Sequence, residues 1–598
     1  MRPEETDGRI RLLRDAMQQA GIAAAIIPQS DAHLSEYLAP HWQVRRWLTG
    51  FTGSAGDLVV TLDSAYIWAD SRYWLQAAEQ LRGTCIGVME EGKPDTPSLP
   101  DWLAATLPAG AVVGIDGMLF SVSSAEALAS RLAKAGISLR VDFDPVDSIW
   151  PDRPALPKNE AFIHDTKYAG EDTSAKIGRI LEEVASRGAD SMFVSDLAEI
   201  AWTLNLRGSD VNCNPVVTSF LYLSPETSTL FIDADKLTPE VTAYLSANNI
   251  AVSSYSDIKN FLAALPADSR VLISPSQTGA ALRDILGERA VTAPSAIAEF
   301  KAVKNDVQLQ GMRNAMLRDG VAMVRSLMEI ERRVSEGIPT TEIDVADILL
   351  ANRSSQPLFF DLSFSTIAGF GPHGAIVHYS ASPESAATLS PDNLLLIDSG
   401  ANYLDGTTDI TRTISLGKPT NAQRFDFTLV MKGHIALASA VYPAGTRGAQ
   451  LDVLARMPLW KEGLSYLHGT GHGVGHFLNV HEGPQSIRLN DTGTPLRPGM
   501  ITSNEPGLYR EGQYGIRCEN LVLTTEAFTS DFGRFYRFET LTLCPFDLSL
   551  FDTSMMSQQE IDWVNDYHAM VCEKLIPVLD AEAQAWLIKK TQRLTKPE

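Results

Sequence analysis

Four glycines alternate with other residues inside the run His-Gly-Thr-Gly-His-Gly-Val-Gly-His, which extends from His468 to His476. The histidines recur every four residues, a spacing that would place them on one face of a helix. Each interior glycine costs a helix about 1 kcal/mol relative to alanine, so a helix here would be destabilised by about 4 kcal/mol. We therefore predict an extended segment, in which His468, His472 and His476 share a face and the glycines allow close backbone approach.

Carboxylates surround this segment in the chain. Asp398 ends an apolar run, Asp409 follows the phrase Asp-Gly-Thr-Thr, Glu505 precedes Pro-Gly, and Glu519 follows Arg-Cys. Carboxylates together with a histidine are a suitable ligand set for hard divalent cations. The region from residue 394 to residue 519 is therefore a candidate metal site.

Two strand-like runs suggest how Asp398 and Asp409 meet, because an apolar run precedes Asp398 and a run rich in β-branched residues surrounds Asp409. A hairpin with a two-residue turn at 405–406 would hold the carboxylates about 13 Å apart. Metal ions of a dinuclear site lie only about 3.5–4 Å apart. We therefore predict a register centred between Tyr403 and Leu404, with Asp398 directly opposite Asp409.

These residues, in this order and in this local context, resemble the metal ligands of the pita-bread metallopeptidases, the superfamily of methionine aminopeptidase, prolidase and aminopeptidase P. The ligands implied are Asp398, Asp409, His472, Glu505 and Glu519. Within the superfamily, the segments 468–475 and 479–484 are most similar to aminopeptidase P. The resemblance covers the whole chain and implies the long form, an α/β (α+β) protein with two creatinase-like N-terminal α/β domains followed by a pita-bread catalytic domain.

The resemblance also implies the chemistry of the site. Four carboxylates and one neutral imidazole carry a formal charge that balances two divalent cations, and the oxygen-rich set favours Mn²⁺, with Co²⁺, Mg²⁺ and Zn²⁺ left open. In the family, a metal-bridging hydroxide attacks the peptide carbon and Glu505 acts as the proton shuttle. His378, His468 and His481 match the histidines that orient substrate and assist proton transfer.

Arg517 lies two residues before Glu519 and so shares its strand face, and we predict that it orients a ligand carboxylate. His373, His434 and His476 are assigned structural roles outside the site.

The activity implied is removal of the N-terminal residue from peptides whose second residue is proline. One alternative is a prolidase acting on Xaa-Pro dipeptides. A second, from a different class, is an inactive pita-bread module that binds peptides. The presence of all five ligand residues disfavours such a module, and it equally disfavours metal-free, creatinase-like hydrolysis.

The chain divides into four predicted segments. Four prolines between residues 142 and 158 predict a first domain boundary, and a second is expected near residue 300, before a long helix that ends near Gly337. A pattern of helix, glycine and short strand occurs once in each N-terminal half, which suggests an internal duplication. The expected domains are 1–155 and 156–300, both creatinase-like, the catalytic domain 301–550, and a helical C-terminal extension 551–598 that begins with a capping box at Ser557 and Glu560.

The composition of the chain indicates which binding partners and which cellular compartment are compatible with it. The net charge of −23 and the isoelectric point near 4.9 argue against nucleic acid and anionic membranes as partners. The five cysteines are odd in number and form no CxxC pair, which favours a reducing compartment and disfavours a zinc–thiolate site. The start of the chain lacks a signal-like apolar region and no run is long enough to span a bilayer. We predict a cytoplasmic protein, and the family resemblance implies a homodimer.

Overall fold

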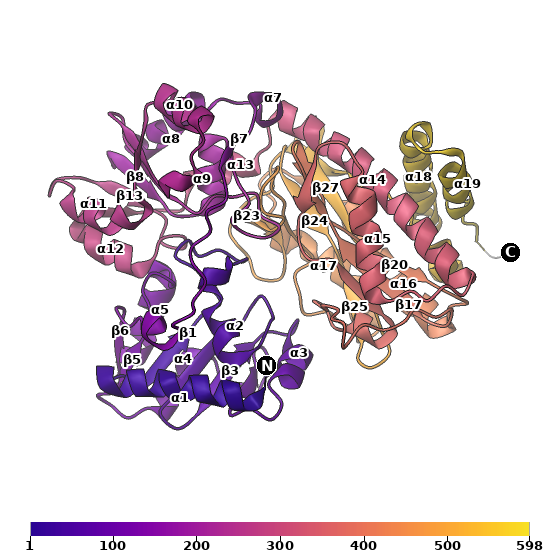
Figure 1. The fold of residues 1–598 in the computed structure, drawn as a ribbon. Helices are drawn as coiled ribbons and strands as arrows, with labels where there is room; N and C mark the ends of the chain where they lie inside the picture. Colours follow the sequence, from indigo (N-terminus) through magenta and orange to yellow (C-terminus); the bar gives the residue numbers. More distant parts are fainter. Residues whose placement is uncertain (1, 597–598) are drawn as a thin grey trace. The chain divides into compact units, whose positions relative to one another are not determined.

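The computed structural model of the protein describes residues 2–596. Its contacts separate two compact units: the first extends to Ile297 but omits Lys167–Gly170, and the second contains those four residues and the chain from Ala298 onward. The division lies close to the boundary expected near residue 300, whereas the boundary expected at residue 155 falls inside the first unit. Figure 1 shows the course of the chain through both units.

The first unit contains two six-stranded sheets with the same strand order. The first sheet runs in the order β4 (Gly87–Glu90), β3 (Ala65–Ala69), β2 (Asp57–Thr61), β1 (Ala24–Ile27), β5 (Val112–Gly114) and β6 (Ser138–Arg140). The second runs in the order β12 (Ile250–Ser253), β11 (Ser228–Phe231), β10 (Phe220–Leu223), β8 (Ser191–Val194), β13 (Val271–Ile273) and β14 (Ala290–Thr292). Each pairing has the same direction in both sheets. This correspondence confirms the internal duplication.

Helices precede the corresponding strands of the two sheets. α1 (Pro3–Ala20) ends at Gly21, whose φ of 69° is left-handed, and α8 (Thr173–Ser186) ends just before the left-handed Gly188. The repeated pattern of helix, glycine and short strand in the sequence predicts both ends. The remaining helices of this unit and of its junctions are α2 (Val44–Thr49), α3 (Trp74–Gln80), α4 (Leu99–Thr106), α5 (Val122–Ala133), α6 (Val146–Ile149), α7 (Thr166–Ala169), α9 (Leu197–Leu204), α10 (Pro239–Ala247), α11 (Ile258–Ala264), α12 (Ala280–Leu286) and α13 (Ala296–Ala302), with the short strands β7 (Phe162–Ile163) and β9 (Leu206–Arg207).

The second unit contains the predicted long helix, α14 (Asp306–Ser335), which begins at a capping box formed by Asn305 and Gln308. The capping box predicted at Ser557 and Glu560 likewise starts α18 (Gln558–Leu575). The other helices are α15 (Glu342–Ser354), α16 (Asn421–Ala438), α17 (Gly448–Lys461) and α19 (Ala581–Lys590). Apolar residues of α16 and α18 share one core cluster, so the C-terminal helices pack onto the unit that holds the candidate site.

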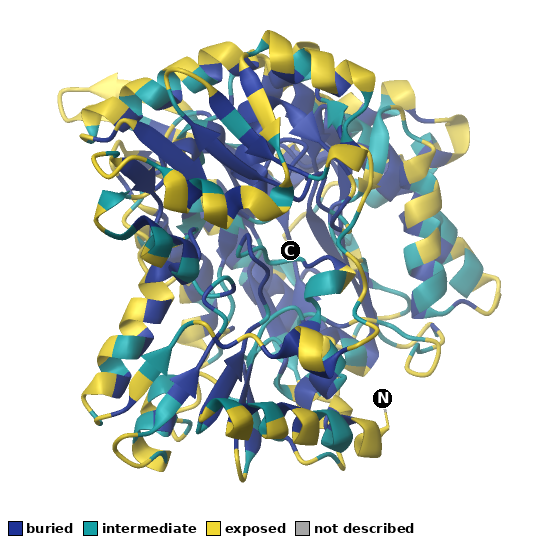
Figure 2. Ribbon diagram, turned by 60° about the vertical axis from the view of Figure 1, so that its left-hand side comes forward, coloured by how far each residue is buried: buried dark blue, intermediate teal, exposed yellow. Residues whose placement is uncertain are grey.

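The strands of this unit form four small sheets. Their members, in sheet order, are β15 (Phe359–Leu362), β18 (Ala401–Tyr403) and β19 (Gly406–Thr407); β16 (Ile367–Phe370), β17 (Leu394–Ser399) and β20 (Ile410–Ser415); β21 (Val441–Pro443), β28 (Gly533–Thr540), β27 (Asn520–Ser530), β24 (Ile501–Asn504), β22 (Gly471–Gly473) and β23 (Glu482–Ile487); and β25 (Gly507–Arg510) with β26 (Tyr514–Arg517). Most strand residues are buried while the helices expose their outer faces, as the colours of Figure 2 show. Among residues 2–596, no helix combines the length and the apolar character that crossing a membrane requires.

The hairpin that carries the two aspartates differs in register from the prediction. Asp398 of β17 lies opposite Thr411 of β20, so the prediction that it directly faces Asp409 is wrong. Asp409 lies two residues before Thr411 and is therefore a diagonal neighbour of Asp398 on the same face of the hairpin. Such neighbours are about 7–8 Å apart, close enough for both side chains to reach one dinuclear site.

Contacts with α14 explain this register. The turn consists of Leu404 and Asp405, because Tyr403 pairs with Gly406. Asp405 forms an ion pair with Arg318 of α14, and a Cβ atom at Gly406 would lie only 2.8 Å from Cβ of Ala315. Packing against a helix about 90 residues away in sequence thus sets the position of the turn.

Candidate metal centre

The five predicted ligands lie in strands of the second unit or directly beside them. Asp398 is in β17 and Asp409 directly precedes β20, while His472 is the central residue of β22. Glu505 directly follows β24, and Glu519 lies between β26 and β27. Three of the four carboxylate residues, Asp409, Glu505 and Glu519, therefore lie just outside the paired strands.

The glycines around His472 have the role that their alternation predicts. Residues 468–476 contain no helix, and the extended conformation is confirmed for Gly471–Gly473, whereas the chain bends at His468, Thr470 and His476. A Cβ atom on Gly471 would lie 2.0 Å from the carbonyl oxygen of Ser503, and one on Gly473 would lie 2.4 Å from that of Glu482. Only glycine at these two positions lets β22 approach its neighbours this closely.

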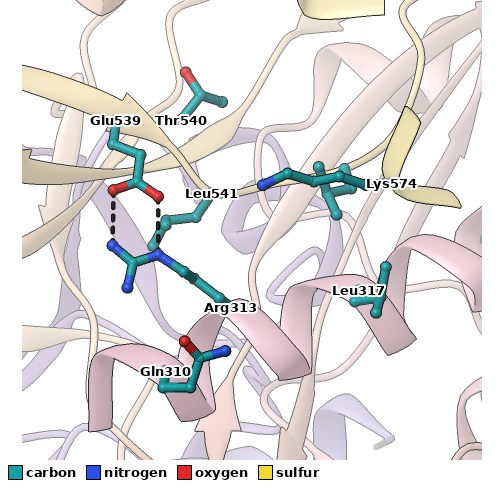
Figure 3. A pocket seen from close by; sticks show the side chains of 8 residues that line it. Gln310, Arg313, Leu317, Glu539, Thr540, Leu541 and Lys574 are labelled. Carbon is teal, nitrogen blue, oxygen red and sulfur yellow. Dashed lines mark hydrogen bonds and ion pairs between the residues drawn. The ribbon is translucent and has the colours of Figure 1, made fainter. Parts of the chain in front are cut away.

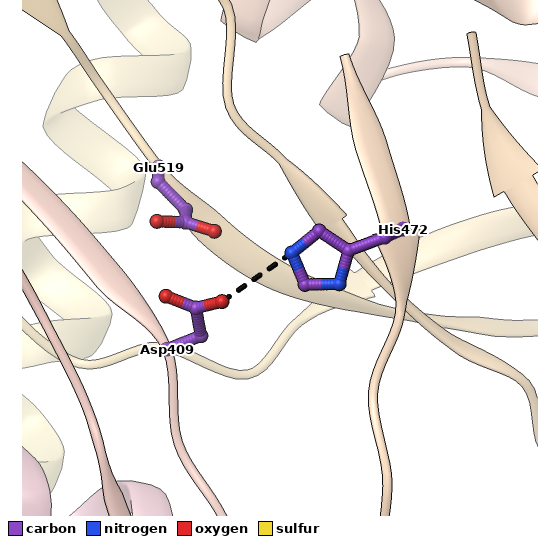
Figure 4. A group of neighbouring side chains, drawn as sticks. All are labelled: Asp409, His472 and Glu519. Carbon is purple, nitrogen blue, oxygen red and sulfur yellow. Dashed lines mark ion pairs between the residues drawn. The ribbon is translucent and has the colours of Figure 1, made fainter. Parts of the chain in front are cut away.

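Asp409, His472 and Glu519 form the centre of the site (Figure 4). Each offers a ligand atom, and these atoms all lie within 4.8 Å of one another. Nε2 of His472 lies 3.4 Å from Oδ2 of Asp409. Nδ1 of His472 lies 2.9 Å from the carbonyl oxygen of Gly473 and must donate to it, because a carbonyl only accepts. This hydrogen bond fixes the ring with Nε2 directed toward the carboxylates.

Glu505 and Asp398 complete the set. Oε1 of Glu505 lies 3.6 Å from Nε2 of His472 and accepts a hydrogen bond of 3.2 Å from the hydroxyl of Ser503. Asp398 is close enough to Asp409 for the two charges to repel each other. The structure thus brings all five residues together.

The raised pKa values of the buried ligand side chains favour the binding of cations at this cluster. Burial and the neighbouring carboxylates raise the pKa of Glu519 well above its usual value, and burial together with Asp409 raises that of Asp398. Although burial lowers the pKa of His472, its hydrogen bond to Asp409 and the charge of Glu505 raise it to about 9. Buried like charges of this kind are stable only when protonated or when cations neutralise them.

Two buried oxygens supply a direct test of fit. Oδ1 of Asp398 and Oε1 of Glu519 have no hydrogen-bond partner in the protein, and buried carboxylate oxygens without partners are costly. The other oxygen of each residue is bonded, since Asp398 accepts from Arg517 and Glu519 accepts from the hydroxyl of Thr411 at 2.8 Å. The free oxygens are therefore the atoms that divalent cations would coordinate.

A chain of hydrogen bonds links the ligand Asp398 to Arg517, Tyr509 and His468. Nη2 of Arg517 donates to Oδ2 of Asp398 at 2.6 Å, and Nη1 donates to the hydroxyl of Tyr509 at 2.8 Å. That hydroxyl in turn lies 2.8 Å from Nε2 of His468. Burial, opposed by Arg517, raises the pKa of Tyr509 to about 12, so the phenol keeps its proton. Arg517 thus contacts the carboxylate of Asp398, and its role in orienting a ligand stays a prediction.

The remaining histidines lie at different distances from the ligands. The ring of His481 packs edge-on against that of His472, with centroids 4.4 Å apart. His378 lies in a turn directly after Val377, whose carbonyl accepts a 3.3 Å hydrogen bond from Arg517. His434 lies in α16, and its Nδ1 is 3.2 Å from the carbonyl oxygen of Cys518. The structure thus places His378, His468 and His481 around the ligand set, and their roles stay predictions.

Three polar residues of the site, Thr411, Ser503 and Tyr509, were not predicted from the sequence. Thr411 and Ser503 bond ligand carboxylates and Tyr509 bonds Arg517. Thr411 lies two residues after Asp409, so strand periodicity would have indicated it. The place of Tyr509 depends on the pairing of Gly507 with Arg517, which the sequence does not reveal.

A pocket of about 270 Å³ elsewhere in this unit is distinct from the metal centre (Figure 3). Gln310, Arg313, Leu317, Glu539, Thr540, Leu541, Leu543 and Lys574 line it. Glu539 is the one carboxylate in this lining and is bound by Arg313 through two hydrogen bonds of 2.9 and 2.8 Å. The pocket therefore lacks a ligand set for a metal.

Comparison with known families accounts for nearly the whole chain. Residues 310–526 match metallopeptidase family M24, and residues 534–594 match the C-terminal region of peptidase M24. Residues 9–148 and 152–308 each match the creatinase/prolidase N-terminal domain. The fold class predicted from the sequence is thereby confirmed.

Individual relatives align over almost their full length. Aminopeptidase P2 of Arabidopsis thaliana is 43% identical, with 96% of this chain and 87% of the relative covered. A probable Xaa-Pro aminopeptidase P of Aspergillus flavus is 41% identical, with 100% and 94% covered. The crystal structure of an X-prolyl aminopeptidase from Caenorhabditis elegans, a cytosolic enzyme with a di-nuclear active site, is 36% identical and superimposes with a TM-score of 0.95 over 99% of this chain and 100% of that one. On this similarity and the ligand set above, the chain belongs to the aminopeptidase P family of M24 metallopeptidases.

Proposed function

We propose that the protein is a metal-dependent aminopeptidase that releases the N-terminal residue from peptides with proline in the second position. The observation that carries this proposal is the convergence of Asp398, Asp409, His472, Glu505 and Glu519 in a chain that is similar over its full length to Xaa-Pro aminopeptidases. A peptide-binding module without activity would not need to retain five ligands and their hydrogen-bonded supports.

Two divalent cations fit the donor set, and we propose Mn²⁺, because four of the five ligands are carboxylates. Asp398, Asp409 and Glu519 would hold both ions, and His472 and Glu505 would complete one of them. When bound, such a pair would polarise the scissile carbonyl and acidify a water molecule. The di-nuclear site of the Caenorhabditis elegans enzyme supports the number of ions.

The side chains around the ligands would handle protons and orient the peptide. Glu505 is the proposed proton shuttle, since its carboxylate lies beside His472 and its pKa is raised by burial. Nδ1 of His468 donates to the carbonyl of Gly469 at 2.7 Å, so Nε2 accepts from the phenol of Tyr509. His378, His468 and His481 would orient the substrate, and Arg517 would hold the Asp398 carboxylate in place.

A substrate comparison tests this function. An Xaa-Pro dipeptide and a longer Xaa-Pro peptide should be assayed with Mn²⁺, after chelation, and after Mn²⁺ is restored. We expect cleavage of the longer peptide that chelation abolishes and Mn²⁺ restores. Cleavage of the dipeptide alone would identify a prolidase, and full activity after complete metal removal would contradict the proposal.

A substitution at the centre of the site supplies the structural control. Asp409→Asn should reduce kcat/KM at least about 100-fold, because the amide cannot replace a charged ligand between two cations. Glu526→Gln, an exposed position on β27, should leave the rate unchanged. Equal rates for both variants would exclude this cluster as the active site.

We further propose that the protein is a cytoplasmic homodimer. Each chain would contain the creatinase-like domains 1–155 and 156–300, the catalytic domain 301–550 and the helical C-terminal extension 551–598. The family resemblance supports the dimer and the domain division, and the cytosolic Caenorhabditis elegans relative supports the compartment. Sedimentation velocity at micromolar concentration should give the mass of two chains of 65.2 kDa each. A monomer mass under these conditions would refute the dimer.

A further inference from the structure

Glu342, the first residue of α15, is a fully buried carboxylate outside the ligand set. It accepts hydrogen bonds from the main-chain amides of Phe370 at 2.7 Å and Ala387 at 2.8 Å, and from the hydroxyl of Tyr379 at 2.9 Å. Nδ1 of His373 lies 2.9 and 3.0 Å from its two oxygens. Carboxylate oxygens accept hydrogen bonds, so the two amides, the hydroxyl and the imidazole nitrogen are the donors.

All four donors belong to one stretch of chain, residues 370–387. Apart from Phe370, which ends β16, and the short 3₁₀ turn Gly371–Ala375, this stretch has no regular structure. It has a few hydrogen bonds within its turns but lacks the continuous ladder that fixes a strand or a helix, and the four contacts with Glu342 supply part of the missing support. The rings of His373 and Tyr379 stack with centroids 4.4 Å apart, which further ties the two ends of the turn together.

The same stretch touches the metal centre on its other side. A Cβ atom at Gly515 of β26 would lie 1.7 Å from the carbonyl oxygen of Gly374, so the two backbones are in direct contact. Arg517, at the end of β26, donates to the carbonyl of Val377 at 3.3 Å and to Asp398 at 2.6 Å. His378 lies between Val377, which Arg517 holds, and Tyr379, which Glu342 holds.

We propose that Glu342 is a positioning residue for His378, acting through Tyr379 and His373 rather than by contact with substrate. The inference rests on the proposed function, in which His378 contacts the peptide. Replacement by glutamine keeps the size of the side chain but presents an NH₂ group to donors, so at least one buried donor loses its acceptor. The turn would then shift, and displacements of about 1 Å can reduce turnover about 100-fold.

A double-mutant cycle distinguishes positioning from general destabilisation. Glu342→Gln, His378→Ala and the double variant should be compared for kcat, KM and bound metal in the Mn²⁺-loaded full-length protein. We expect Glu342→Gln to lower kcat/KM about 10- to 100-fold with unchanged metal content, and to have little further effect once His378 is alanine. Glu331→Gln, which changes a carboxylate of α14 that bonds Trp586 and Lys590, should match the unaltered enzyme.

Each outcome bears on a different claim. If His378→Ala loses activity but Glu342→Gln does not, or if the two losses multiply in the double variant, Glu342 does not act through His378 and the inference is wrong. If His378→Ala itself is fully active, the proposed role of His378 is wrong and the inference with it, while cleavage of Xaa-Pro peptides still stands or fails by its own assay. Tyr379→Phe, which removes one donor and keeps the ring, should lower kcat/KM in the same direction and covers the case in which Glu342→Gln does not fold.

Discussion

At the scale of single residues, Arg517 is the side chain on which the geometry of the ligands most depends. Its guanidinium bonds Asp398 and Tyr509 at the same time, and a lysine ammonium cannot span both with one fixed fork. Arg517→Lys should therefore lower metal affinity or kcat/KM about 10- to 100-fold, measured by metal content after dialysis and by steady-state kinetics. Arg510→Lys, on the same hairpin but paired with Asp426, is the control, and an equal loss there would contradict a specific role.

His568 of α18 makes stability depend on pH away from the metal centre. Burial, with the charge of Arg412 added, lowers its pKa to about 3, and its Nε2 accepts the amide of Phe546 at 3.1 Å. The unfolded chain, with an ordinary pKa near 6.5, binds the proton first, so the stabilisation is complete above pH 6.5 and is lost as the pH falls toward 3. The slope for one such group is about 1.4 kcal/mol per pH unit.

The measurement is the thermal midpoint between pH 5 and pH 8, compared between the unaltered protein and His568→Gln. The glutamine oxygen can take the place of Nε2 as acceptor but does not titrate. We expect a flatter dependence on pH in the variant. An identical dependence in both proteins would show that His568 does not bind the proton on unfolding.

At the scale of elements, the approach of the 371–375 turn to β26 allows no side chain at Gly515, since the added Cβ would meet the carbonyl of Gly374 at 1.7 Å. Gly515→Ala should destabilise the fold by about 1–3 kcal/mol through overpacking and reduce activity, because the turn leads to His378. Gly178→Ala in α8, where nothing lies within 4 Å, should instead stabilise by about 0.5–1 kcal/mol. Urea unfolding of both variants checks the opposite signs.

Local signals predicted the elements well. The capping box at Ser557 and Glu560, the glycine ends of α1 and α8, and the extended conformation around His472 all depend on residues close together in sequence. Each of these follows from a backbone preference or a local hydrogen bond.

Features set by distant contacts escaped prediction. The register that pairs Asp398 with Thr411 depends on the packing of the 404–405 turn against α14. The hydrogen bond from Arg517 to the hydroxyl of Tyr509 requires the register of another hairpin. The ligand set itself was inferred by resemblance, and no spacing rule would have joined five residues so far apart.

At the scale of the whole molecule, bound cations should stabilise the fold as well as catalyse. Without them, the raised pKa of Glu519 means that the folded state holds protons more tightly than the unfolded state. The stability of the metal-free protein should therefore fall as the pH rises. Mn²⁺ at 100 times its dissociation constant should restore about 2.7 kcal/mol.

Scanning calorimetry with and without chelator, at pH 6 and pH 8, measures both effects. We expect the gain on adding Mn²⁺ to be larger at pH 8. Asp409→Asn should show a smaller gain than the unaltered protein at either pH. A thermal midpoint that is insensitive to metal would contradict the proposed ligand cluster.

The spread of the ligands along the chain also governs when the site can form during synthesis. Glu519 is added 121 residues after Asp398. At a translation rate of about 5–20 residues per second, roughly 6–24 s separate the synthesis of the first ligand from that of the last. A nascent chain that stalls within this interval contains some of the ligand residues but lacks Glu519. The complete set of five ligands therefore exists only after translation has passed Glu519, and a chain that ends before this residue lacks one of them.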